Sequence, residues 1–180
     1  MFPPPIDEFV YISDSTYKRE EVIEFESHML HVLQFEVAAI TEKNFLRRYL
    51  MAAAADIRSR KFLQYTVMLS NYLIERTMQD YYFVRYVPSL IASSAICLSL
   101  HTLGLPAWTP TLQHYTGYAM EDPLFQSCLS DLLHLYQHAR RTQLSGDGSL
   151  QAVNDKYQDD KYLAVSRIPA PTDLPAITKD

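Results

Sequence analysis

Apolar residues recur at intervals of three and four along most of the chain, and this spacing constrains the fold more than any other feature. Between residues 17 and 35 the apolar residues that recur at this spacing include Val22, Phe25, Met29, Val32 and Leu33. Such spacing places side chains on one face of a helix. No segment alternates apolar and polar residues for long enough to form a sheet strand. The pattern therefore predicts an all-α fold.

Further helices are predicted from the same periodicity together with proline and glycine. Helices open at Thr41, Pro88, Pro110 and Pro123, since threonine is a good N-cap and proline suits a first turn. Another helix, with Phe62, Tyr65, Leu69, Tyr72 and Leu73 on one stripe, follows a polar break at 56–60. Gly104 ends the helix that begins at Pro88, which is apolar on most sides and is expected at the centre of a bundle.

The two ends of the chain are predicted to be less regular. The triplet at 3–5 is all proline, which favours an extended start over residues 1–16. Ser13–Thr16 offers N-caps for the helix at 17–35. Residues 145–148 form a loop, 149–161 a short charged helix, and the proline-rich tail from Ile168 an extended segment.

Composition excludes several classes of protein. Only 4 of 180 residues are glycine, which argues against collagen and phosphate-binding loops. With 21 acidic and 16 basic side chains the net charge is −5, so no nucleic-acid partner is expected. The densest basic groups are Arg58, Arg60 and Lys61, and then Arg140 with Arg141. Both groups are interpreted as solvated helix ends, with a local basic patch as the alternative.

No membrane segment or signal peptide is predicted, and a soluble intracellular protein is expected. The most apolar stretch, 87–105, is interrupted by Pro88, four serines and His101. Cys97 and Cys128 lie inside apolar runs without CxxC spacing, which is typical of buried thiols in a reducing compartment.

Signatures of catalysis or cofactor binding are weak. His28 with His31, and His134 with His138, are spaced to share a helix face. Neither pair has a third ligand at a matching offset, so no metal site is predicted. No Walker loop, GxGxxG or GxSxG motif occurs. These observations predict a helical binding module that is not an enzyme and holds no cofactor, although a helical metalloenzyme stays an alternative.

Several motifs together resemble those of mitotic cyclins. Residues 9–17 (FVYISDSTY), 21–26 (EVIEFE) and 30–35 (LHVLQF) are similar to the end of the first cyclin box. Residues 73–81 (LIERTMQDY) and 88–95 (PSLIASSA) resemble segments of B-type cyclins. The same holds for 108–118 (WTPTLQHYTGY) and 156–166 (KYQDDKYLAVS). The sequence is identified as a member of the A/B-type group, leaning to the B-type.

The resemblance implies a fold and an organisation. Cyclins consist of two consecutive five-helix boxes. By this likeness residues 1–36 are the C-terminal remnant of the first box, 37–166 a complete second box, and 167–180 an extended tail. By the same likeness the chain is expected to be an N-terminally truncated cyclin. The helix at 17–35 should then leave an apolar face unburied unless it folds onto the second box.

The resemblance also implies a function. Cyclins bind and activate a cyclin-dependent serine/threonine kinase, in the nucleus and the cytoplasm, and the last helix of the first box contacts the kinase. The matching positions here are Asp14, Arg19, Glu26, Leu30 and Phe35. On the residues alone, Leu30 and Phe35 could equally be core residues and Glu26 a solvated charge. A cyclin-fold module for transcription or scaffolding, without kinase activation, is the alternative, and the net negative charge counts against it.

Overall fold

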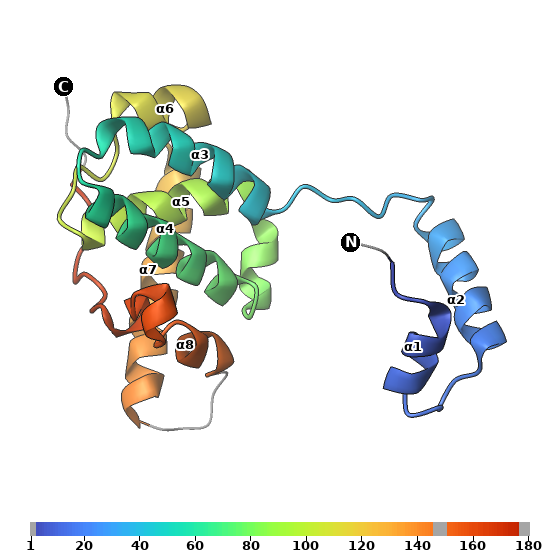
Figure 1. The fold of residues 1–180 in the computed structure, drawn as a ribbon. Helices are drawn as coiled ribbons and strands as arrows, with labels where there is room; N and C mark the ends of the chain where they lie inside the picture. The colour runs from blue at the N-terminus through green and yellow to red at the C-terminus, as the bar shows by residue number, and fades with distance from the viewer. Residues whose placement is uncertain (1–2, 146–150, 177–180) are drawn as a thin grey trace. The chain divides into compact units, whose positions relative to one another are not determined.

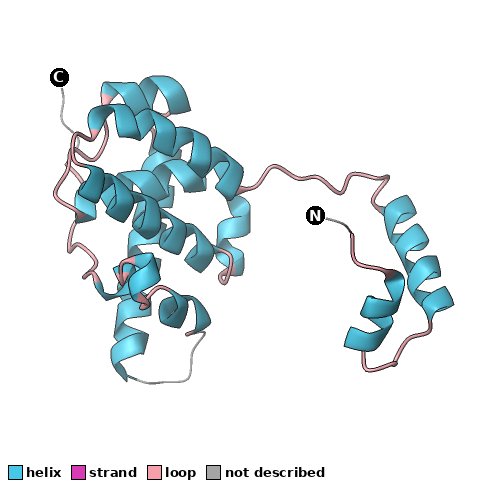
Figure 2. Ribbon diagram, in the orientation of Figure 1, coloured by secondary structure: helices cyan, strands magenta, loops and turns pink. Residues whose placement is uncertain are grey.

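The computed structural model describes residues 3–145 and 151–176, and these residues form helices and loops without any strand (Figure 2). The predicted all-α fold is confirmed. The chain divides into two units, Met1–Ala39 and Ile40–Asp180.

Unit 1 contains two helices, α1 (Ile6–Ile12) and α2 (Arg19–Val32), which pack against each other (Figure 1). The prediction of an extended start over residues 1–16 is wrong after the prolines. Pro5 lies just before the first turn of α1, and Asp7 and Glu8 follow it, where acidic side chains favour the helix dipole.

The start and end of α2 also differ from the predicted helix at 17–35. Ser13–Thr16 belongs to the turn after α1 and does not cap α2. The N-cap of α2 is Lys18, whose backbone N–H donates to the Glu21 carboxylate at 2.7 Å. At the other end Gln34 and Phe35 adopt positive φ angles of 50° and 60°, which terminate the helix.

Unit 2 contains the remaining helices (Figure 1). They are α3 (Glu42–Asp56), α4 (Arg60–Thr77), α5 (Pro88–Thr102), α6 (Pro110–Thr116), α7 (Pro123–Ser145) and α8 (Ala152–Lys156), with 3-10 turns η1 (Tyr81–Arg85), η2 (Asp160–Tyr162) and η3 (Val165–Arg167). The predicted openings at Thr41, Pro88, Pro110 and Pro123 are confirmed.

Helix α5 lies at the centre of unit 2, as predicted. Eleven consecutive residues, Leu90–Leu100, are buried, and the helix contacts α3, α4 and α7. Alanine and serine along α5 allow close approach of its neighbours. Ser99 donates to the Ala95 carbonyl at 2.7 Å and accepts from Ser70 of α4 at 3.0 Å, so its buried hydroxyl is satisfied.

Two glycines end helices in the left-handed conformation. Gly104 follows α5 with φ of +70°, and Gly117 follows α6 with φ of +78°. Other residues are strained at such angles. This agrees with the predicted role of Gly104.

The C-terminal region is more closely packed than predicted. The predicted helix over 149–161 is reduced to α8 and η2. The predicted loop over 145–148 is wrong at Ser145, which is the last residue of α7, and residues 146–150 lie outside the described residues. The tail after η3 lies against the bundle: the Tyr136 hydroxyl donates to the Ile168 carbonyl at 2.7 Å, and Gln137 to the Pro171 carbonyl at 2.8 Å. Ile168, Ala170 and Leu174 pack on the core.

Both cysteines should resist alkylation in the native state. Cys97 and Cys128 are fully buried, and burial raises the pKa of both thiols, that of Cys128 to about 12. Because the thiolate is the reactive form, we expect 5,5′-dithiobis(2-nitrobenzoate) to label them at least about a hundredfold more slowly at pH 8 than in 8 M urea. Rapid labelling of either thiol without denaturant would contradict its placement in the core.

Candidate functional site

Helix α2 is strongly two-sided. At about 100° per residue, its apolar residues fall within one half of the helix circumference, which we call the apolar arc. The arc consists of Val22, Ile23, Phe25, Met29, Leu30, Val32 and Leu33. The opposite half carries Glu20, Glu21, Glu24, Ser27, His28 and His31.

The apolar arc is not covered in the described structure of unit 1. No residue between 3 and 39 is buried. Phe25 is 62% exposed and Val32 67% exposed, while Leu30 is half-buried. Within its described residues, unit 1 by itself does not bury the apolar face of this helix. Contiguous exposed apolar surface of this kind marks interaction sites.

Two of the predicted site residues carry charge inside the apolar arc. By helical position Arg19 and Glu26 fall between Leu33 and Leu30. Arg19 donates to the Asp7 carboxylate of α1 at 2.8 Å. Within the described residues, the exposed Glu26 carboxylate makes no hydrogen bond or ion pair. A charge that has no partner within its own chain and lies among apolar residues is suited to setting the register of a binding partner.

The other predicted residues lie beyond the two ends of α2. Asp14 is exposed in the turn before the helix, with φ of 53°. Phe35 is 64% exposed after the helix, and its ring centre lies 5.9 Å from that of His31. The structure therefore brings Arg19, Glu26 and Leu30 onto one face, and places Asp14 and Phe35 at opposite ends of a helix about 20 Å long.

Asp7 was missed by the sequence reasoning. Its contact with Arg19 spans twelve positions and depends on α1, which the proline-rich start argued against. A hollow lined by Tyr17, Glu21, Val22 and Phe25 adjoins the arc, and it was not foreseen either, because helical periodicity does not describe surface relief.

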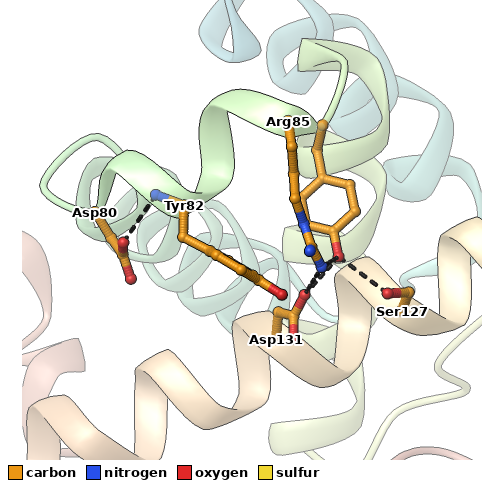
Figure 3. Close-up of polar contacts among 6 residues, drawn as sticks. Asp80, Tyr82, Arg85, Ser127 and Asp131 are labelled. Atoms are coloured by element: carbon orange, nitrogen blue, oxygen red, sulfur yellow. Dashed lines mark hydrogen bonds and ion pairs between the residues drawn. The ribbon is translucent and has the colours of Figure 1, made fainter.

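A dense polar cluster in unit 2 joins η1 to α7 (Figure 3). The Arg85 guanidinium lies 3.8 Å from the Tyr82 ring centre and donates to Asp131 at 2.6 Å. The Tyr86 hydroxyl also donates to Asp131, and lies 3.0 Å from the Ser127 hydroxyl. Burial and then the hydrogen bond to Asp131 raise the pKa of Tyr86. The cluster contains no histidine that could activate Ser127. We therefore interpret the role of the cluster as structural, because its contacts hold η1 against α7.

The histidine pairs do not come together with further ligands. Across residues 3–145 and 151–176, no group of three or more His, Cys, Asp or Glu side chains is arranged to hold a metal ion. Within the same residues, no helix combines the length and apolar character needed to cross a membrane.

Comparison with known proteins extends over both units. Residues 40–171 match the family of the cyclin C-terminal domain, and residues 1–38 match that of the cyclin N-terminal domain. The chain is 39% identical over 176 residues to G2/mitotic-specific cyclin-A of Hydra viridissima, an alignment that covers 97% of this chain and 39% of that protein.

Relatives of both mitotic types are found. Cyclin-A1 of Homo sapiens is 35% identical, in an alignment that covers 97% of this chain and 34% of that protein. G2/mitotic-specific cyclin-B of Spisula solidissima is 34% identical, in an alignment that covers 94% of this chain and 36% of that protein. The chain thus spans less than two fifths of each of these relatives. These identities to A-type and B-type relatives do not support the predicted preference for the B-type. With both family matches and a helical bundle in unit 2, the chain belongs to the cyclin family.

Proposed function

We propose that this chain acts as the regulatory subunit of a cyclin-dependent serine/threonine kinase in the cell cycle, and that the apolar arc of α2 is its kinase-binding surface. The observation that carries the proposal is the uncovered arc with Glu26 inside it. Membership of the cyclin family supports it, since cyclins are regulatory subunits. Asp14, Arg19, Glu26, Leu30 and Phe35 are the proposed contacts.

The proposed mechanism is allosteric. The arc packs beside the PSTAIRE-type helix of the kinase and moves that helix inward. This movement completes the lysine–glutamate pair that phosphoryl transfer requires. Leu30 and its apolar neighbours supply burial, whereas Glu26 and Arg19 select a complementary charge pattern. All of the chemistry belongs to the kinase.

A calorimetric titration of the full chain into a purified cyclin-dependent kinase tests the proposal. We expect saturable one-to-one binding that requires folded kinase. The absence of binding at protein concentrations of about 100 µM, where even a weak interface is detected, would refute the assignment. Location in the nucleus and the cytoplasm remains a prediction, which a fluorescent fusion in dividing cells would test.

We expect the 180-residue chain to activate a kinase poorly on its own. Unit 1 buries none of its described residues, so its two helices are held by few packing contacts and must be ordered on binding, which lowers affinity. The measurement is histone phosphorylation by the kinase with saturating chain, compared with an intact mitotic cyclin at equal concentration. A rate equal to that of the intact cyclin would contradict this prediction.

A further inference from the structure

An apolar cleft of about 280 Å³ opens in unit 2 where α3 ends and α4 begins. Its floor consists of buried side chains from three helices, namely Ala53, Leu100 and Leu112. Its walls include Ile57 and Phe62. A cleft of this size accommodates one or two large apolar side chains rather than a cofactor.

Phe62 forms one wall and is available to a partner. It belongs to the predicted apolar stripe of α4, but its side chain is 41% exposed, whereas Leu69, Tyr72 and Leu73 of the same stripe are buried. The ring therefore contributes little to the core of unit 2 and lies beside an open apolar floor.

Three basic residues lie at the cleft or next to its lining residues in the sequence. Arg58 lines the cleft, and Arg60 and Lys61 follow at the start of α4. All three are exposed and have no acidic partner among the described residues. The one acidic residue that lines the cleft, Asp56, is already engaged, because it accepts from the Thr109 hydroxyl at 2.6 Å and from the Thr111 hydroxyl at 3.1 Å.

This charge arrangement is unfavourable within the chain itself. The first turn of α4 has no acidic residue, and Ser59 makes no side-chain capping bond. Basic side chains at a helix N-terminus lie against the positive end of its dipole. Three basic residues against the single carboxylate of Asp56 leave an excess of positive charge near the apolar floor, which an acidic ligand would complement.

The cleft lies far from the point where the chain enters unit 2. Helix α3 begins at Glu42 and reaches the cleft at Ala53 and Asp56, about 20 Å further along the helix axis. A partner at the cleft therefore need not displace the segment that leads into α3.

We propose that this cleft docks a linear peptide segment of a partner protein, with a large apolar side chain against Phe62 and acidic side chains on Arg58, Arg60 and Lys61. The apolar contact supplies burial and the three cations supply orientation and selectivity. This docking does not involve α2. Failure of the docking test would therefore leave the kinase-binding proposal unchanged, and failure of the kinase-binding test would leave the docking proposal unchanged.

The test is fluorescence anisotropy of the full chain with a labelled hexapeptide in which leucine and phenylalanine are flanked on each side by two acidic residues. We expect a dissociation constant on the order of 100 µM. Phe62→Ala and Arg58→Glu should each weaken binding about tenfold. The matched controls Met51→Ala and Arg47→Glu, at exposed positions of α3 outside the cleft, should leave it unchanged.

Three results would overturn the proposal. The first is no binding of the hexapeptide at about 1 mM chain, the limit for a useful docking contact. The second is equal binding of a hexapeptide whose acidic residues are replaced by lysine. The third is Arg58-dependent binding of a DNA duplex or of phosphatidylserine vesicles with no binding of the peptide, which would assign the cations to a polyanion.

Discussion

Replacing Glu26 and Leu30 together by alanine should weaken kinase binding by about a hundredfold. Leu30 is a half-buried residue of the apolar arc, and Glu26 lies one helical turn before it. The double substitution removes an apolar anchor and the charge that sets register. Alanine favours a helix, so α2 should persist, which circular dichroism would verify. The measurement is calorimetric titration with the kinase.

A matched control lies on the opposite half of α2. Glu24 and His28 are both exposed, and Glu24→Ala with His28→Ala should change the kinase affinity less than about threefold, since rim charges contribute little. Unchanged affinity in the Glu26/Leu30 variant would remove the arc from the interface. Equal losses in both double variants would instead indicate a general effect on unit 1.

Phe125→Ala should reduce the free energy of unfolding of unit 2 by about 3–5 kcal/mol. Phe125 is fully buried at the start of α7. Its ring centre lies 4.7 Å from that of Trp108, and it stacks on Tyr118 at 6.0 Å. Removal of the ring leaves a cavity between two aromatic side chains that cannot close without moving the α6 region.

Urea denaturation, followed at 222 nm and by the fluorescence of the single tryptophan, measures this loss. The neighbouring Leu124 is 65% exposed, so Leu124→Ala should change the unfolding free energy by less than about 0.5 kcal/mol. Phe125→Leu should lose only about 1.5 kcal/mol because most of the volume is retained. A loss below 1 kcal/mol for Phe125→Ala would show that the aromatic group is loosely packed.

Some features of the fold could be predicted because they depend on neighbours in sequence. Thr41 caps α3, with its backbone N–H donating to Asn44 at 3.0 Å, and prolines open α5, α6 and α7. The all-round apolar composition of residues 90–100 was sufficient to place α5 at the centre, since such a helix must be covered on every side.

Other features could not be predicted because they depend on residues far apart in sequence. A seven-residue helix such as α1 is too short to be stable by itself, so its existence depends on contact with α2. Phe62 has the same helical spacing as the buried residues of α4, and only the positions of α5 and α6 leave it half-exposed beside the cleft.

The candidate site divides in the same way. The sequence alone determined that α2 is two-sided and that Glu26 falls among apolar residues, because both follow from 3.6 residues per turn. It also determined the family, through motifs in both units. Only the tertiary structure decided that the arc lacks a cover in unit 1, that Arg19 pairs with Asp7, and that basic residues lie near an apolar floor. Burial and pairing are properties of surfaces brought together by folding, and local spacing does not specify which surfaces meet.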